Sequence, residues 1–386
     1  MAKIKGIIGL RPSKEEIVEV TCPPYDVIKE GSVIEGVLKK RDNSLYHVTL
    51  GKKPGEVLQR LINQKIMLPD EEPCYYVYEQ NYDGISRTGV LSAVEVSDYA
   101  LGEIIRHEKT FDDKVKGRLE LRSKTGYTFE PVFLLTEAKI EDTLENIKQN
   151  HSPVYEFSSD FENNSELHGI YNRIYRIPEA SSAGIELQKN LSEYPLYIAD
   201  GHHRYHASLL NHQTHFLGYI CPTTKVVVQA YNRLINGKKS FGSIIGQIPL
   251  QETGIFTTPM KHCFAIYTKD KSFLLEAQKI PNDVIGKLDC SILEKELYPI
   301  LGLTHELIMD PRHFDYYPEA ELEQMKKRVD AGEYEIAVAL HPVSIEELVA
   351  VANAGIKDPQ IVMPEKSTYF SPKILSGIII YRHICK

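Results

Sequence analysis

The sequence predicts a mixed α/β protein with two domains. The chain has 386 residues, which exceeds the length at which a single hydrophobic core stops growing. Strand-like and helix-like segments alternate along it, and this alternation is typical of sheets covered by helices. The composition of 42% hydrophobic and 25% charged residues is that of an ordinary globular protein and excludes a disordered or fibrous one.

Several elements of the first half can be placed from pattern and punctuation. Tyr75–Tyr82 and Thr88–Tyr99 flank an Asp-Gly pair, so we expect a β-hairpin there. Pro131–Leu135 is expected to be a strand that starts at its proline, and apolar residues at helical spacing predict a helix over Ile140–Ile147. A further apolar strand is expected at Tyr197–Ala199.

The second half has a different pattern. Lys225–Ile235 is β-branched and strand-like, Met260–Lys279 predicts a hairpin, and Leu288–Leu303 predicts an amphipathic helix. A helix–strand–helix pattern follows, and each helix is expected to end at a glycine, Gly332 and Gly355. We therefore expect a catalytic domain over residues 1–245, and a C-terminal α/β domain over residues 246–386.

Charge and cysteine content limit the partners and the compartment. A net charge of −8 argues against a nucleic-acid-binding surface, which would need a basic face. No apolar stretch approaches the roughly 20 residues that span a bilayer, and the N-terminus lacks a secretory signal pattern, so we expect a cytoplasmic protein. The six cysteines are widely spaced and predict free thiols rather than disulfides: Cys22, Cys74, Cys221, Cys263, Cys290 and Cys385.

The most informative segment is Leu196–Leu210, in which an apolar strand meets an Asp-Gly turn and a helix begins near His202. Gly201 allows a sharp turn and a close approach to a ligand. The first N–H groups of a helix have no partner within it, so they attract phosphate. Arg204 adds a planar set of donors. Asp200, at the end of the strand, is expected to hold a Mg²⁺ ion that bridges phosphates.

Two other interpretations of this segment remain. Asp200 can be an ordinary helix cap, with the histidines packed or solvated. His202 and His206 also stand at the spacing of a zinc-binding pair, although the segment has no HExxH motif and no evident third ligand.

The string Asp-Gly-His-His-Arg at residues 200–204 resembles the phosphate-binding signature of the ParB/sulfiredoxin-like fold, above all that of the free L-serine kinases. That family also has a His-Glu pair, a helix and a Pro-led strand upstream. This chain has His107–Glu108, a charged helix-like segment and Pro131–Leu135 in the same order. The resemblance implies a ParB/sulfiredoxin-like core over about residues 100–240.

Nearly the whole chain is also similar to the family called domain of unknown function 1015. The strings that carry this similarity are GLRPS, CPPYDV, RHEKT, GRLELRSKTG, ADGHHRYHAS, YNRLI and MPEKSTYFSPKILSG. The resemblance implies a small-molecule kinase that makes O-phospho-L-serine from free L-serine. Pyrophosphate is the expected donor, because the sequence has neither a P-loop nor a kinase glycine-rich loop, and ADP or ATP stays open.

The resemblance also implies roles for individual residues. Glu108 is expected to be the base that deprotonates the serine hydroxyl, with His107 beside it and Asp200 as the Mg²⁺ ligand. By the same resemblance, Gly201, His202, His203 and Arg204 are expected to bind phosphate. The sequence around them adds further candidates: for phosphate binding Arg118, Arg122, Lys366 and Lys373, and for substrate binding Tyr25, Asp26, Thr110 and Arg233.

Some of these residues are also candidates from their own pattern. Arg118 and Arg122 share a helix face at a spacing of four, although charged helix faces are usually just solvated. Lys366 and Lys373 lie in an apolar, Pro-punctuated string, and we expect a lid or clamp from the C-terminal domain, the alternative being edge-strand lysines. Asp26 follows a rigid Pro-Pro step, where it can contact the substrate or simply form a turn.

Three other functions fit parts of the same pattern. A phosphatase of a small phosphorylated metabolite would use the same groups in the opposite direction. A non-catalytic nucleotide-binding switch of the ParB type would use only the turn, but no helix-turn-helix pattern accompanies it. A sulfiredoxin-type reductase would need a cysteine where this chain has His202 and His203. We expect no nucleic-acid or membrane partner. The sequence leaves undecided whether the protein is a homodimer.

Overall fold

The computed structural model describes residues 1–110, 112–159, 161 and 168–383. The chain forms two compact units, one made of Met1–Val226 with Pro372–Lys386 and the other of Val227–Ser371. Both units contain sheets and helices, so the mixed α/β class is confirmed. The units divide at residues 226/227 and 371/372, whereas the sequence suggested a single boundary near residue 245.

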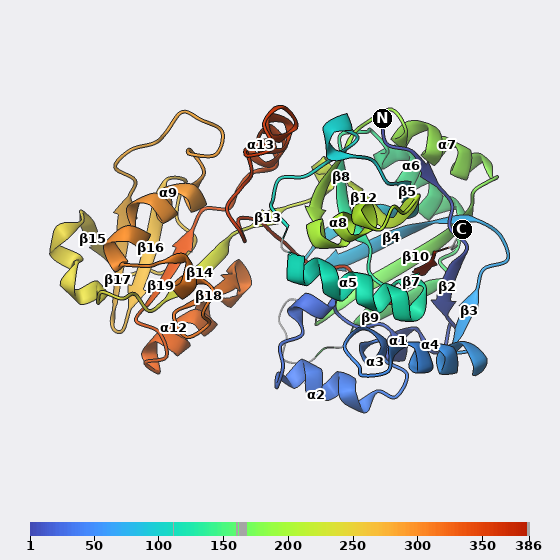
Figure 1. Ribbon diagram of the computed structural model, residues 1–386, viewed down its shortest axis with the longest axis horizontal. Helices are drawn as coiled ribbons and strands as arrows, with labels where there is room; N and C mark the ends of the chain where they lie inside the picture. The colour runs from blue at the N-terminus through green and yellow to red at the C-terminus, as the bar shows by residue number, and fades with distance from the viewer. Residues whose placement is uncertain (111, 160, 162–167, 384–386) are drawn as a thin grey trace. The chain divides into compact units, whose positions relative to one another are not determined.

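The first unit is built on a large mixed sheet (Figure 1) with the strand order β6-β11-β8-β12-β5-β4-β10-β9, and β1 pairs with β5. Its strands are β1 (Ile4–Lys5), β4 (Cys74–Tyr82), β5 (Ile85–Glu95), β6 (Ile104–Ile105), β8 (Val132–Thr136), β9 (Tyr155–Ser159), β10 (Ile170–Pro178), β11 (Leu196–Asp200) and β12 (His215–Pro222). The hairpin predicted around the Asp-Gly pair is β4–β5.

Helices cover this sheet because their apolar faces need partners. The unit's helices are α1 (Ile17–Val20), α2 (Val33–Lys40), α3 (Tyr46–Thr49), α4 (Pro54–Asn63), α5 (Asp112–Thr125), α6 (Glu141–Asn150), α7 (Ser182–Leu191) and α8 (His202–Leu210). Leu144 of α6, Leu187 of α7 and Tyr205 of α8 share one hydrophobic core with sheet residues such as Val90 and Ile198. Figure 1 shows α6 and α7 on one side of the unit and α1–α4 on the opposite side.

A small second sheet ties the C-terminal segment into the first unit. Its order is β3 (Met67–Pro69), β2 (Gly9–Pro12), β21 (Ile380–Arg382) and β7 (Tyr127–Thr128). The backbone of Ser376 also pairs with that of Cys22. These pairings satisfy the backbone groups of the last segment within the first unit. The expectation that residues 246–386 form one domain was therefore wrong for residues 372–383.

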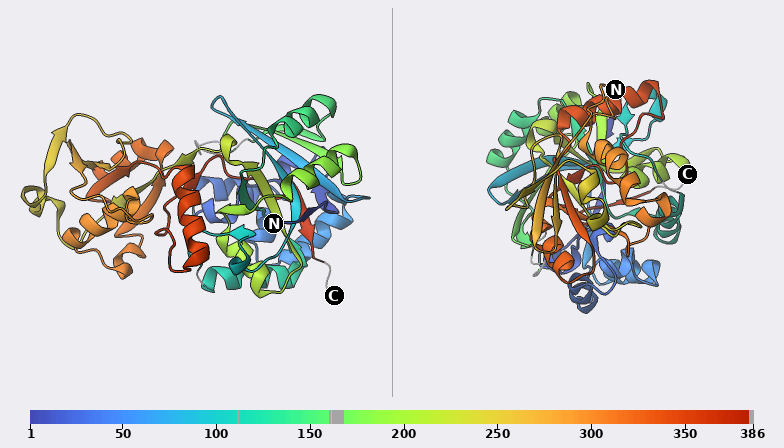
Figure 2. Two further views of the ribbon diagram at one scale, coloured as in Figure 1. Left: turned by 90° about the horizontal axis from the view of Figure 1, so that it is seen from above. Right: turned by 90° about the vertical axis from the view of Figure 1, so that its left-hand side faces the viewer.

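The second unit contains a sheet of order β15-β17-β16-β19-β14-β18 and a separate β13–β20 ladder. Its strands are β13 (Val228–Gln229), β14 (Tyr231–Ile235), β15 (Leu250–Thr253), β16 (Cys263–Thr268), β17 (Lys271–Glu276), β18 (Phe314–Pro318), β19 (Ile336–Leu340) and β20 (Tyr369–Phe370). Its helices are α9 (Asp289–Glu296), α10 (Tyr298–Leu301), α11 (His305–Ile308), α12 (Leu322–Asp330) and α13 (Ile345–Lys357). Met325 and Val329 of α12 pack on the sheet, which Figure 2 shows from two further directions.

Several expectations for this unit hold and several do not. The predicted hairpin is β16–β17, and Gly332 follows α12 with the positive φ of 77° that favours glycine. The helix expected over Leu288–Leu303 is divided into α9 and α10, with Pro299 in the first turn of α10. Gly355 does not end α13, which continues to Lys357. Short 3₁₀ helices complete the chain: η1 (Tyr25–Val27), η2 (Tyr99–Leu101), η3 (Thr223–Lys225), η4 (Phe241–Ser243), η5 (Ile245–Gln247) and η6 (Glu319–Glu321).

The cysteines of the described residues are free thiols, as the sequence predicts: Cys22, Cys74, Cys221, Cys263 and Cys290. Cys385 lies outside the described residues. Within residues 1–110, 112–159, 161 and 168–383, no helix has both the length and the apolar character that crossing a membrane requires.

Candidate functional site

The His-Glu pair and the Asp-Gly turn come together because they follow two neighbouring parallel strands. β6 pairs with β11 in parallel, with Ile104 opposite Leu196 and Ile105 opposite Tyr197. The carboxyl ends of parallel strands meet at the same edge of a sheet, which is where open α/β sheets bind ligands. His107 and Glu108 follow β6, and the turn at residues 200–201 follows β11. A register shift between Ile198 and Asp200 marks a bulge at this end of β11.

His107, Glu108 and His202 form the centre of this site. The rings of His107 and His202 pack edge to face with centroids 4.5 Å apart, and the backbone N–H of His107 donates to Nε2 of His202 at 3.5 Å. Oε2 of Glu108 lies 3.8 Å from Nδ1 of His202. The two histidines are 1% and 4% exposed, whereas the Glu108 side chain keeps 21% of its surface. Of these three side chains, the Glu108 carboxylate is therefore the one that a substrate can reach from solvent.

Burial keeps both imidazoles neutral. It lowers the pKa of His107 to about 4, and burial together with the neighbouring His107 holds the pKa of His202 well below its usual value. Both rings are therefore uncharged at neutral pH, and His202 cannot bind phosphate as a cation. A neutral His202 that accepts at Nε2 carries its proton on Nδ1, the atom that faces Glu108. The site thus places a neutral N–H donor 3.8 Å from a carboxylate, beyond hydrogen-bond distance.

The turn after β11 has the geometry that a glycine requires. Gly201 precedes α8 with φ at 96°, and a Cβ there would lie 2.7 Å from Nε of Arg204. Arg204 donates to the carbonyl of Pro131 at 2.8 Å, and its Nη2 lies 3.3 Å from Oδ1 of Asp200. Lys373 Nζ lies 3.1 Å from the other oxygen of Asp200. Two cations thus neutralise Asp200 beside the first N–H groups of α8.

The available side chains do not suit Mg²⁺ at the predicted ligand. Mg²⁺ prefers oxygen ligands, and Asp200 offers a carboxylate that Arg204 and Lys373 already bind. A different group, His107, Glu108 and His202, offers ligand atoms within 4.8 Å of one another. Two imidazoles and one carboxylate suit a transition metal such as Zn²⁺ better than Mg²⁺. His206, the second member of the zinc pair considered from the sequence, is not in this group, and its ring stacks with that of Tyr99.

A second cluster, which the sequence analysis missed in part, lies next to the turn. Arg118 lies 3.5 Å above the ring of Tyr25, and its Nη1 is 3.7 Å from Oε2 of Glu130. Glu130 is buried and also accepts from the backbone N–H of Tyr25 and the hydroxyl of Ser376, both at 3.2 Å. Burial raises the pKa of Glu130. The signal for this residue was a lone carboxylate at the edge of an apolar run, just before Pro131.

The remaining predicted site residues fall in different places. Asp26 is exposed in η1, and Thr110 lies half-buried in the loop between β6 and α5. His203 is half-buried in the first turn of α8. Lys373 belongs to the first unit, so the expectation that the C-terminal domain delivers it was wrong.

Arg233 and Lys366 belong to the second unit. Arg233 is buried on β14, where it donates to the hydroxyl of Tyr298 at 3.2 Å and to the carbonyl of Lys366 at 3.3 Å. Lys366 Nζ lies 5.4 Å from the ring centroid of Tyr231. Both side chains therefore have partners inside their own unit.

The fold and the site together define a mixed α/β protein in which an Asp-Gly-His-His-Arg turn follows a sheet strand and opens a helix. More particularly, the chain belongs to the family described as protein of unknown function (DUF1015), whose model matches residues 4–291. No curated protein matches the sequence.

Solved structures give weak similarities. They include a conserved hypothetical protein from Pyrococcus furiosus (14% identity, 76% of this chain and 95% of that chain, TM-score 0.39). A free serine kinase in complex with AMP has 13% identity over 75% of this chain and 92% of that one, with a TM-score of 0.37. SbnI with a C-terminal truncation, from Staphylococcus aureus, has 10% identity over 75% and 87%, with a TM-score of 0.40. Structural similarities at this level carry no functional argument.

Proposed function

We propose that this protein is a phosphotransferase that phosphorylates the hydroxyl of free L-serine to give O-phospho-L-serine. The observation that carries the proposal is the placement of the Glu108 carboxylate 3.8 Å from a neutral His202 ring, at the start of α8. Arg204 and Lys373 lie at the adjoining turn. A base beside a cationic, N–H-rich turn is what phosphoryl transfer requires. The choice of serine is supported by the resemblance of residues 200–204 to the serine kinase signature.

In the proposed reaction Glu108 accepts the hydroxyl proton while the serine oxygen attacks the donor's phosphorus. The new O–P bond forms as the bond from phosphorus to the donor's bridging oxygen breaks, and the leaving phosphate keeps that electron pair. We propose that Nδ1–H of His202 comes within hydrogen-bond distance of the Glu108 carboxylate when the substrates bind, and so orients it. The first N–H groups of α8 and Arg204 stabilise the negative charge on the phosphate oxygens.

Pyrophosphate is the proposed donor, because a compact cationic turn suits a small polyanion. Asp200 is already bound by Arg204 and Lys373, so it is not proposed as a Mg²⁺ ligand. A requirement for Mg²⁺ is still proposed, because this ion commonly binds through the phosphate oxygens of the substrate. Tyr25, Asp26 and Thr110 stay the proposed contacts for the serine.

The test is an assay for phosphoserine with L-serine, Mg²⁺ and one donor at a time: pyrophosphate, ADP or ATP. Glu108→Gln removes the base, and we expect turnover to fall by about 10²–10⁴-fold. Glu120→Gln, which removes an exposed carboxylate of α5, is the matched control and is expected to keep full activity. Absence of phosphoserine with every donor would contradict the proposed reaction, and an active Glu108→Gln variant would contradict the role of Glu108.

A further inference from the structure

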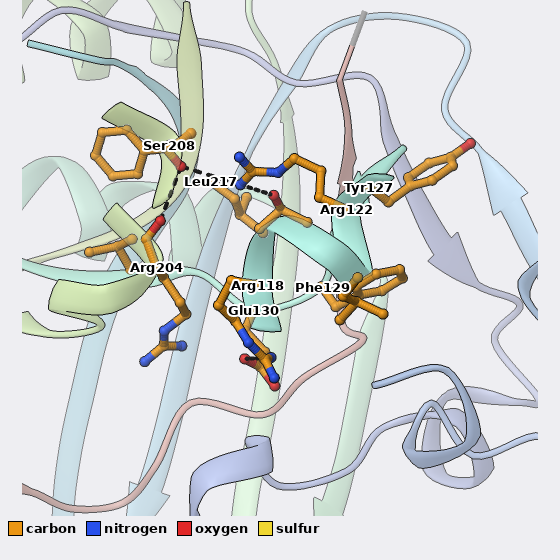
Figure 3. Close-up of a pocket in the computed structure, with 12 residues that line it drawn as sticks. Arg118, Arg122, Tyr127, Phe129, Glu130, Arg204, Ser208 and Leu217 are labelled. Atoms are coloured by element: carbon orange, nitrogen blue, oxygen red, sulfur yellow. Dashed lines mark hydrogen bonds and ion pairs between the residues drawn. The ribbon is translucent and has the colours of Figure 1, made fainter. Parts of the chain in front are cut away.

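A small pocket lies between α5, α8 and the strands β7 and β8 of the first unit. Its cavity volume is about 30 Å³, which is more than one water molecule needs. Three arginines and one carboxylate are among the residues that line it: Arg118, Arg122, Arg204 and Glu130. In Figure 3 Arg122 points toward Ser208, while Arg118 lies against Glu130.

The carboxylates near this pocket are paired with two of the three arginines. Glu130 is the ion-pair partner of Arg118, and Asp200 is that of Arg204. Arg122 has a different set of contacts. Its Nη2 donates to the hydroxyls of Thr128 and Ser208 at 3.2 and 3.3 Å.

Within the part of the chain that the structure describes, Nε and Nη1 of Arg122 are buried without a hydrogen-bond partner. Burial lowers the pKa of Arg122 to about 10, which still leaves the guanidinium charged at neutral pH. The Arg122 side chain as a whole is half-buried, and the structure describes no ion pair for it within residues 1–110, 112–159, 161 and 168–383. Removing part of a cation from water without an anionic partner is unfavourable, and an anion in the pocket would reduce that cost.

The neighbours of Arg122 also supply a neutral donor. Gln213 Nε2 donates to Nδ1 of His383 at 2.8 Å. Burial, and after it the charge of Arg122, lowers the pKa of His383 to about 3, so this ring is neutral and carries its proton on Nε2. That N–H donates to Oγ1 of Thr128 at 2.6 Å. Because Oγ1 of Thr128 accepts from both His383 and Arg122, its own O–H remains to donate to a ligand.

We propose that Arg122 and Thr128 form a second oxyanion subsite, next to the turn at residues 200–204, that binds a phosphate group. Arg204 is shared by this subsite and the turn, because it lines the pocket and forms an ion pair with Asp200 at the turn. The ligand is either free inorganic phosphate or the distal phosphate of a pyrophosphate donor. The choice of phosphate over other small oxyanions rests on the proposed function.

The test is equilibrium dialysis of the full chain with radiolabelled inorganic phosphate, which counts bound ions and needs no catalysis. The wild type is expected to bind two phosphates per chain, one at the turn and one at Arg122. Arg122→Met is expected to bind one fewer. Lys124→Gln, which removes an exposed cation from the same helix, is the matched control and is expected to bind as many as the wild type.

The outcomes separate this subsite from the proposed function. One phosphate in the wild type and none in Arg122→Met would support the subsite while arguing against a phosphate site at the turn. The same number and affinity in Arg122→Met and in the wild type would overturn the subsite, and so would a wild type that binds none. Thr128→Val keeps the side-chain volume and is expected to lower the affinity for the second phosphate by about tenfold.

Pyrophosphate then distinguishes the two sources of the phosphate group. If the subsite takes the distal group of the donor, one pyrophosphate displaces both labelled phosphates. If the subsite takes free phosphate, pyrophosphate displaces only the ion at the turn.

Discussion

Arg122 in the first unit and Arg233 in the second both have buried guanidinium nitrogens and neutral hydrogen-bond partners, but their surroundings differ. Arg233 lies over the ring of Tyr316, with Cζ 4.6 Å from the centroid, and donates to a tyrosine hydroxyl and to the backbone carbonyls of Tyr231 and Lys366. Among the described residues, Arg122 donates through Nη2 alone, and it lines a pocket. A buried arginine bound to carbonyls and rings stabilises the fold, whereas one that lines a pocket is placed to bind a ligand.

The largest expected effect is on Arg233. Arg233→Met leaves the two carbonyls without this donor, so we expect the free energy of unfolding of the second unit to fall by about 3 kcal/mol. Urea unfolding, with hydrogen exchange to follow the second unit, measures this change. Lys269→Met, at an exposed position of the same unit, is the control. A change as small as that of the control would show that Arg233 is not structural.

A smaller effect is expected in the pH dependence of the first unit. The pKa of His383 is about 3 in the folded protein and near 6.5 in an unfolded chain, so the unfolded chain takes up the proton first as the pH falls. Neutral His383 therefore contributes its full stabilisation above pH 6.5 and loses it as the pH falls toward 3. Over this range the folding equilibrium constant decreases by at most about tenfold per pH unit.

Arg122→Met removes a cation that lowers the pKa of His383. As the pH falls, the free energy of unfolding of this variant should therefore decrease less steeply than that of the wild type. Unfolding in phosphate-free buffers between pH 7 and pH 4 measures the slope. Arg233→Met, in the other unit, should leave the slope of the first unit unchanged. An equal slope in Arg122→Met and the wild type would mean that Arg122 does not influence His383.

The smallest effect concerns the stability of Arg122→Met itself. Without phosphate, loss of a half-buried charge that has no ion pair among the described residues should change the free energy of unfolding by less than about 1 kcal/mol, or raise it. Thermal unfolding with and without phosphate provides the measurement, because phosphate should raise the melting temperature of the wild type more than that of the variant. A loss of unfolding free energy as large as that expected for Arg233→Met would show that Arg122, like Arg233, mainly stabilises the fold.

The sequence alone predicted the local parts of the candidate site well. The strand, the turn at Gly201 and the start of α8 at His202 were all expected, because apolar runs and glycine report on local backbone geometry. The paired placement of His107 with His202 could be expected only from the resemblance to the kinases. It depends on β6, a strand of two residues that no periodicity can reveal.

Long-range pairing and ionisation could not be predicted in the same way. Lys373 was assigned to the C-terminal domain, because nothing in the sequence indicates that β21 pairs with β2 across some 370 residues. His202 was expected to bind phosphate, and the sequence could not show that burial keeps its ring neutral. Arg122 and Arg233 were both candidate ligand-binding residues in the sequence. Only the structure distinguishes the carbonyls around one from the pocket beside the other.

The path of the chain between the units has a consequence for biosynthesis. The first unit is interrupted at Val226 and resumes only at Pro372, so the ribosome completes the second unit before it supplies the segment that contains Lys373 and β21. Until that segment emerges, Asp200 lacks one of its two cations, and β2 lacks one of its neighbours. The contacts around the turn at residues 200–204 are therefore completed last, after every residue of the inserted unit has been translated.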